Sequence, residues 1–170
     1  YLGADTFRAG IRRYIEDNTL SNSTTANLWS ALAAASGKPV PALAADWVEQ
    51  PGFPIVTVTT AGTGTDRHLA LAQTRFTYDN LPAAPLLWKI PLTLANTAAL
   101  DAPAVCLLAT AAGTAPVPAG SGTVKANVGD AGYYRVLYDD PLAESLRRAL
   151  PTLPVADQLN LLADTDALVE

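Results

Sequence analysis

The feature that most constrains this 170-residue sequence is that its hydrophobic period changes twice. Up to about residue 52, apolar residues recur every three or four positions, which is typical of amphipathic helices. From 53 to 139 they alternate with a period of two, which is typical of half-buried strands. The helical period returns over 140–170. The sequence therefore predicts an α+β chain in three parts, with boundaries at 1–52, 53–139 and 140–170.

The first part predicts N-terminal helices separated by polar or proline-containing breaks. Asp5 is expected to cap the first helix and residues 23–25 the second, because short polar side chains accept hydrogen bonds from free N–H groups. Phe7 is expected on the apolar face of the first helix, and Gly37 is expected to end the second. A short third helix carries Trp47 and ends before Pro51 and Pro54, since proline cannot continue a helix.

The middle part predicts a central antiparallel β-sandwich of about seven strands. Short alternating segments joined by Pro, Gly and Ala loops are typical of that architecture. A change of phase at Gln73 indicates a bulge. Pro91 lies on the polar side of the clearest strand and indicates an edge strand or a bulge. The strands expected from the pattern include 55–59, 68–78, 88–94, 105–109, 123–128 and 133–138.

The pattern over residues 140–170 predicts a return to helices. Pro141 suits a first helical turn, and prolines at 151 and 154 separate this helix from the next. The acidic residues of the second helix are expected to cap it and to line its solvent-exposed side. The expected apolar positions are Leu142, Leu146, Leu150, Leu159, Leu162 and Leu168, and the acidic ones are Asp157, Asp164, Asp166 and Glu170.

Composition excludes several classes of function. A net charge of −5 and a pI near 4.7 argue against a nucleic-acid partner. No run of about 18 apolar residues predicts a membrane segment. The single cysteine, Cys106, lies among apolar residues and is expected to be a buried structural thiol. A single cysteine does not determine the cellular compartment of the protein, and we expect the cytoplasm. Because the chain lacks methionine and stops within a predicted helix, we expect it to be a segment of a longer protein.

No set of residues predicts catalysis or metal binding. His68 is the only histidine, whereas a catalytic zinc needs three protein ligands, so a structural role is expected for it. Trp29 and Trp47 are expected in the core or at contacts between domains. Arg135 is expected either to pair with a carboxylate across an interdomain seam, with Tyr138 beside it, or to be simply exposed.

Three stretches, read in order, resemble one family. The combination resembles the zinc aminopeptidases related to aminopeptidase N and the puromycin-sensitive aminopeptidase, a group of gluzincin metallopeptidases. The stretches include Trp47-Val48-Glu49-Gln50-Pro51-Gly52-Phe53-Pro54, then Gln73-Thr74-Arg75-Phe76 with Trp88-Lys89-Ile90-Pro91-Leu92, then Val124-Lys125-Ala126-Asn127 with Gly132-Tyr133-Tyr134-Arg135-Val136-Leu137-Tyr138-Asp139 and Asp157-Gln158.

The resemblance implies a specific place for the chain in a longer enzyme. Residues 1–52 would be the last helices of the catalytic domain, 53–139 a β-sandwich spacer, and 140–170 the first helices of the C-terminal domain. Zinc and peptide substrates would belong to the parent protein. The family's His-Glu-x-x-His motif is absent, so no catalytic, metal-binding or substrate-binding residue is carried over, and the segment is expected to be inactive by itself.

A different class of function is the alternative. A free-standing sandwich could bind a protein or a carbohydrate through exposed aromatic side chains. Exposure of Trp88 and Tyr134 in one patch would favour this binding module, whereas burial of both would favour the spacer.

Overall fold

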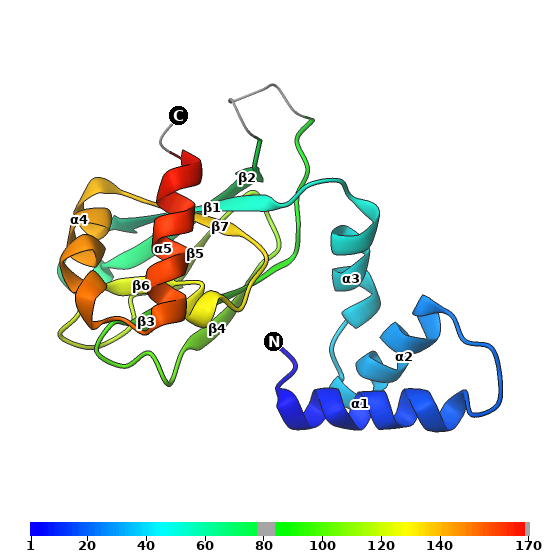
Figure 1. The fold of residues 1–170 in the computed structure, drawn as a ribbon. Helices are drawn as coiled ribbons and strands as arrows, with labels where there is room; N and C mark the ends of the chain where they lie inside the picture. Colours follow the sequence, from blue (N-terminus) through cyan, green and yellow to red (C-terminus); the bar gives the residue numbers. More distant parts are fainter. Residues whose placement is uncertain (78–83, 169–170) are drawn as a thin grey trace. The chain divides into compact units, whose positions relative to one another are not determined.

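A computed structural model describes residues 1–77 and 84–168, and the chain divides into two compact units, Tyr1–Pro51 and Gly52–Glu170 (Figure 1). Helices form the first unit, whereas strands followed by helices form the second. The predicted α+β order of helices, strands and helices is confirmed. The helices of the first unit are α1 (Ala4–Asp17), α2 (Thr25–Ser36) and α3 (Val40–Glu49).

The ends of α2 follow from local sequence. The Thr24 hydroxyl accepts a hydrogen bond from the Asn27 N–H, and the Asn27 side chain accepts one from the Thr24 N–H at 2.8 Å. Gly37 ends the helix at φ 65°, a left-handed conformation that glycine adopts at little steric cost. Both predicted ends are confirmed. The predicted cap of α1 is wrong, because Gly3 is the N-cap and Asp5 lies in the first turn.

The core of the first unit forms where α1 crosses α2. A Cβ atom on Gly10 would lie 2.7 Å from Leu32 Cδ2, so the two helices approach more closely than a side chain at position 10 allows. Leu32 is buried, but Phe7 of α1 remains 50% exposed. The predicted apolar face of α1 is therefore only partly covered within this unit.

The strands of the second unit lie in two sheets among its described residues. One sheet has the order β5-β2-β1-β7 and the other the order β4-β3-β6. Every neighbouring pair is antiparallel except β1 and β7, which are parallel, so the all-antiparallel prediction is wrong at this pair. The strands are β1 (Pro54–Ala61), β2 (His68–Arg75), β3 (Ile90–Asn96), β4 (Ala104–Leu108), β5 (Ala112–Pro116), β6 (Val124–Ala126) and β7 (Arg135–Tyr138).

Gln73 does not mark a bulge. Strands β1 and β2 pair without interruption over their whole length, and Gln73 lies on the buried face with only 3% exposure. Its Nε2 donates to the carbonyls of Trp88 at 2.8 Å and Thr110 at 3.0 Å, and its Oε1 accepts from the Trp88 N–H. The alternation in the sequence changes phase here because a polar side chain occupies a buried position. Its hydrogen-bonding groups are satisfied.

Pro91 lies on a central strand, which contradicts the prediction of an edge strand or a bulge. At Pro91 only β4 is paired with β3, because pairing with β6 begins at Leu94. At Pro91, β3 therefore has a neighbouring strand on one side only, as at a sheet edge, where proline is tolerated. The expected strand 68–78 ends at Arg75, and Tyr78 lies outside the described residues. Strand β5 was not located from the sequence, since its Ala, Gly and Pro residues favour strands weakly.

Two helices follow the strands, α4 (Asp140–Ala149) and α5 (Val155–Leu168). Asp139 caps α4, since its Oδ1 accepts the Leu142 N–H at 2.9 Å and its Oδ2 accepts the Thr60 N–H of β1 at 2.9 Å. Leu142 and Leu146 are buried, as predicted. Within the described part of the chain, every helix is too short or too polar to span a membrane.

Candidate functional site

Lys125 of β6 lies at the centre of a buried polar network that joins the strands to α5. Its side chain is 0% exposed. The ammonium donates to Asn160 Oδ1 at 2.7 Å and to the carbonyls of Ala126 and Asn127. Asp157 Oδ1 lies 3.5 Å from Lys125 Nζ and accepts the Gly129 N–H at 2.8 Å. Burial lowers the pKa of Lys125, because the charged form loses its hydration, and the neighbouring Asp157 carboxylate opposes that effect.

Asp164 lies one turn beyond Asn160 and also connects α5 to the strands. Its Oδ2 accepts the Val136 N–H at 3.1 Å, and its Oδ1 pairs with Arg135 Nη1 at 3.2 Å. Arg135 Nη1 also donates to the Ala163 carbonyl at 2.9 Å. Burial raises the pKa of Asp164, whereas the hydrogen bonds from Val136 and Arg135 lower it. Arg135 thus pairs with a carboxylate of α5, and its role across a domain seam stays a prediction.

The loop between β6 and β7 is held by Asn127. This residue adopts φ 53°, and its Oδ1 accepts the Gly132 N–H at 2.7 Å. Its Nδ2 donates to the carbonyls of Gly132 and Tyr134. A Cβ on Gly132 would lie 2.2 Å from the Tyr134 ring, so glycine is required there by close packing. The loop is therefore a fixed structure that presents the start of β7 to α5.

Two tyrosines connect the two sheets. The buried Tyr134 hydroxyl accepts a hydrogen bond from the Thr93 N–H of β3, and burial raises the pKa of Tyr134 to about 12. The Tyr138 hydroxyl of β7 accepts the Ala126 N–H at 3.0 Å and donates to the Ala126 carbonyl. Burial likewise raises the pKa of Tyr138. Its ring lines a hollow of about 490 Å³ beside Leu146 and Leu161.

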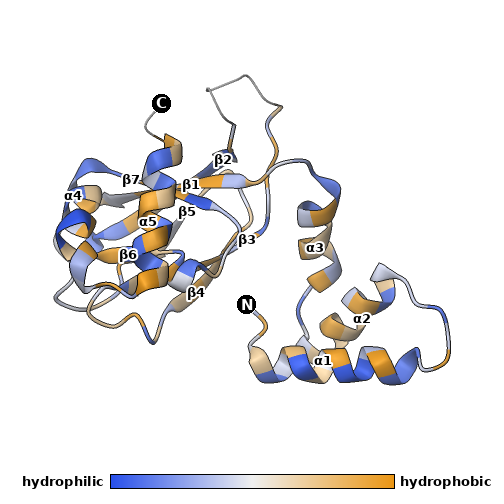
Figure 2. Cartoon of the chain, in the orientation of Figure 1, coloured by the Kyte–Doolittle hydropathy of each residue, from blue (hydrophilic) through white to orange (hydrophobic). Residues whose placement is uncertain are grey.

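Helix α5 buries its polar side and exposes its apolar side, the reverse of the prediction. The polar residues Asp157, Asn160 and Asp164 are 1%, 4% and 4% exposed. Leu159 and Leu162 are 60% and 55% exposed. Figure 2 shows that hydrophilic and hydrophobic residues alternate along α5. The sequence contained a signal, because positions 157, 160 and 164 share one helical face. Asp166 is exposed as expected, and Glu170 lies outside the described residues.

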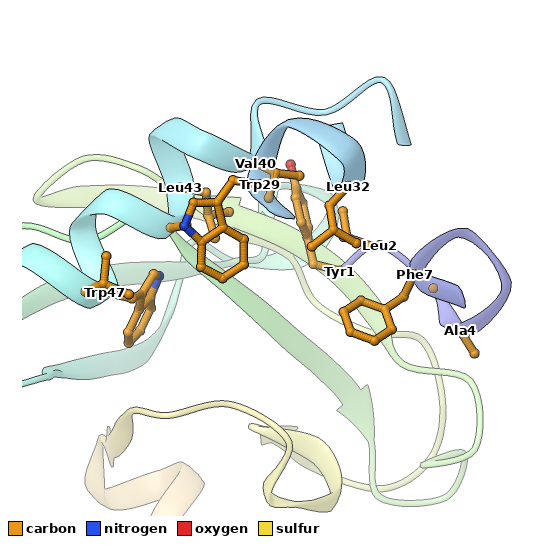
Figure 3. Close-up of a pocket in the computed structure, with 12 residues that line it drawn as sticks. Tyr1, Leu2, Ala4, Phe7, Trp29, Leu32, Val40, Leu43 and Trp47 are labelled. Atoms are coloured by element: carbon orange, nitrogen blue, oxygen red, sulfur yellow. The ribbon is translucent and has the colours of Figure 1, made fainter. Parts of the chain in front are cut away.

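Trp29 and Trp47 lie in the first unit and line an apolar groove of about 590 Å³. Figure 3 shows their indole rings with Tyr1 and Phe7 around this groove. Both tryptophans are half-buried, so neither lies wholly in a core. The structure therefore places the four predicted contact residues in two separate groups, with Arg135 and Tyr138 in the second unit.

The described residues do not fit a catalytic zinc centre. Within 1–77 and 84–168, no group of three His, Cys, Asp or Glu side chains is placed to hold a metal ion. The Nδ1 of His68 lies 2.8 Å from the Asp66 carbonyl, which agrees with the predicted structural role. Cys106 is only half-buried rather than fully buried as expected, and burial raises the pKa of its thiol.

Comparison with known proteins identifies several relatives. Aminopeptidase M1 of Arabidopsis thaliana is 34% identical over 99% of this chain and 20% of its own length. The puromycin-sensitive aminopeptidase of Caenorhabditis elegans is 35% identical over 99% of this chain and 18% of its own length. The Tricorn protease-interacting factor F2 of Thermoplasma acidophilum is 31% identical over 99% of this chain and 20% of its own length.

These relatives are much longer than the chain. The chain spans about a fifth of the length of the curated relatives it matches. No protein-family model matches it.

Proposed function

The chain is homologous over nearly its whole length to one segment of the M1 family aminopeptidases, and we propose that it is a non-catalytic part of a zinc-dependent aminopeptidase. The observation that carries the proposal is the match of 99% of this chain to about a fifth of each relative. The predicted resemblance to zinc aminopeptidases is confirmed. The parent enzyme would remove N-terminal residues from peptides and would hold its zinc in a part outside this chain.

We propose that the two sheets form a β-sandwich that acts as a spacer. In this proposal the catalytic domain ends with residues 1–52, the spacer consists of residues 53–139, and the C-terminal helical domain begins with residues 140–170. Three hydrogen bonds that connect the two sheets support a rigid spacer: Gln73 donates one, and the Tyr134 and Tyr138 hydroxyls each accept one. The buried network around Lys125 would extend this rigidity into α5.

The uncovered apolar surfaces support a role inside a longer chain. The groove beside Trp29 and Trp47 and the leucine side of α5 both leave apolar side chains in contact with water. Such surfaces are typical of sites that another part of a protein covers. We propose that the remaining domains of the same polypeptide cover them, because the relatives are about five times as long as this segment.

The alternative of a free-standing binding module has less support. It required Trp88 and Tyr134 to be exposed in one patch, but they are only 1% and 5% exposed. An aromatic side chain that is buried in the core offers no stacking surface to a ligand.

Hydrolysis of aminoacyl p-nitroanilides tests whether the segment is non-catalytic. The purified 170-residue chain should release no p-nitroaniline, with or without added zinc, because the described residues offer no zinc ligand set. A longer protein that contains this segment should release it in a chelator-sensitive manner. Chelator-sensitive hydrolysis by the segment alone would overturn the proposal.

An insertion in the longer protein tests the spacer. Four Gly and Ser residues after Gly52 should lower kcat/KM for peptides of several residues more than for aminoacyl p-nitroanilides. In this proposal the angle between the catalytic and C-terminal domains shapes the space that holds a peptide. The matched control is the same insertion after Asp101, in the exposed loop between β3 and β4. Equal kinetics for the two insertions would contradict the spacer role.

A further inference from the structure

Helix α5 has a polar face and a leucine-bearing face, and either one could in principle pack against the strands. Successive helical residues are about 100° apart, which places Leu159 and Leu162 on the side opposite Asp157, Asn160 and Asp164. The two leucines are exposed, whereas the three polar residues are buried. Hydrophobic burial by itself would favour the opposite arrangement, because apolar area gains free energy when it leaves water and carboxylates lose it. Within these 170 residues, where Leu159 and Leu162 remain exposed, another feature must therefore select the polar face.

The selecting feature lies on the strands and not on the helix. Lys125 places a buried ammonium opposite the middle of α5, where it meets Asp157 Oδ1 and Asn160 Oδ1. A buried ammonium without an anion and acceptors is strongly unfavourable. The leucine face carries one carboxylate, Asp166, but it lies six residues, or about 9 Å, beyond Asn160 along the helix. Rotating α5 by half a turn would therefore leave Lys125 without its helical partners.

The polar face also matches the surrounding backbone. Asp157 accepts the Gly129 N–H, and Asp164 accepts the Val136 N–H. Asn160 Nδ2 donates to Asp130 Oδ1 at 3.0 Å. The partners of these side chains lie in the loop after β6 and in β7. Each of the three polar residues, Asp157, Asn160 and Asp164, therefore has a hydrogen-bonding partner outside the helix.

We propose that Lys125 is a positioning residue that selects which face of α5 packs on the strands and keeps the leucine face outward. This role goes beyond the proposed function and does not depend on it. A buried ionic group is known to set the register of helices in some proteins even where it adds little stability.

Thiol labelling tests the selection directly. The reporter is Leu162→Cys in a Cys106→Ser background of the full 170-residue chain, because residue 162 lies on the exposed face. In this parent the thiol should react rapidly. In Lys125→Met it should react several-fold more slowly, because α5 turns its leucine face inward. Hydrogen exchange of the α5 amides, measured on the same samples, should remain slow.

Two further variants keep the test independent of simple unfolding. Lys125→Met with Asp157→Asn removes both charges of the buried pair without making the polar face of α5 apolar. It should also label slowly at residue 162. Adding Leu159→Gln to Lys125→Met makes the competing face polar and should restore rapid labelling with α5 amides still protected, which a purely stabilising role of Lys125 does not predict.

Two outcomes would overturn the proposal. If residue 162 labels at the parent rate in both Lys125 variants while α5 stays protected, Lys125 does not select the face. If labelling stays rapid and α5 loses amide protection, the network only holds the helix to the strands. Slow labelling that Leu159→Gln reverses would establish the selection.

Discussion

Helices α4 and α5 follow one another in the chain but bury opposite kinds of side chain. Helix α4 buries Leu142 and Leu146 and leaves Glu144 in solvent with Arg147 and Arg148. Helix α5 instead buries Asp157 and Asp164 and leaves Leu159 and Leu162 in solvent. The comparison teaches that the partner surface decides which face of an amphipathic helix is buried.

The two sets of ion pairs should differ in what they contribute to stability. The Glu144 carboxylate lies 2.8 Å from Arg147 and 2.9 Å from Arg148, but all three side chains are exposed to water and salt. The pair of Lys125 and Asp157 is longer, at 3.5 Å, yet both side chains are almost fully buried. Breaking a buried pair leaves one charge without compensation, so burial matters more than distance here.

The largest effect is expected from breaking the buried pair. Asp157→Asn should lower the free energy of unfolding by about 3–5 kcal/mol, because the buried Lys125 amine loses the carboxylate beside it. Urea unfolding measures this loss. The control is Asp166→Asn on the exposed side of the same helix, which should change stability by less than about 0.5 kcal/mol. Equal losses in the two variants would contradict the buried network.

A second prediction compares leucines on the two helices. Leu146→Ala should cost about 2–5 kcal/mol, since it removes a side chain that is only 2% exposed and leaves a cavity. Leu162→Ala should change stability by less than about 0.5 kcal/mol, because that side chain is mostly in water. Thermal unfolding of both variants measures the difference. A large loss for Leu162→Ala would show that its side chain is covered in solution.

A third prediction concerns Tyr134, the residue before β7, whose buried hydroxyl accepts a hydrogen bond from the Thr93 N–H. Tyr134 has a folded pKa of about 12, against about 10 when unfolded, so the unfolded state loses its proton first as the pH rises. Its contribution is complete below pH 10 and falls by up to about 3 kcal/mol by pH 12. Tyr134→Phe should therefore flatten the alkaline stability curve between these values.

The control for the alkaline curve is Tyr133→Phe. Tyr133 is adjacent in sequence but 71% exposed, so its substitution should leave the shape of the curve unchanged. Urea midpoints measured at intervals from pH 8 to pH 12 give the comparison. An unchanged slope in Tyr134→Phe would contradict the burial of that hydroxyl.

The smallest effect is expected at Glu144. Hydrogen bonds from Arg147 and Arg148 lower the pKa of Glu144 to about 2. A depressed carboxyl pKa contributes stability above the unfolded pKa, and the contribution is lost as the pH falls toward 2. Glu144→Gln should change Tm only slightly at pH 7, and added salt should remove the difference because the pairs are exposed. A change comparable to that of Asp157→Asn would contradict the contrast between the helices.

Local signals in the sequence predicted much of the fold. The cap at Thr24, the stop at Gly37 and the first turn of α4 at Pro141 depend on hydrogen bonds and φ angles of neighbouring residues. The pairing of β1 with β7 and the position of β5 could not be predicted in this way, because both depend on distant strands.

The candidate site was predicted only in part. A carboxylate partner for Arg135 was expected, and the structure supplies Asp164. The central residue, Lys125, was missed, and Asp157 was assigned to the solvent side. Both errors have one cause. A sequence pattern shows that one face of a helix is polar, but it does not show that a buried ammonium lies opposite that face.

The sequence by itself determined where helices and strands form, because period, caps and proline breaks act within a few residues. It also determined the resemblance to zinc aminopeptidases, which relatives over 99% of the chain confirm. Only the tertiary structure decided that α5 turns Asp157 inward and Leu162 outward. The physical reason is that the stability of a buried charge depends on the groups that surround it, and those groups come from segments more than twenty residues away.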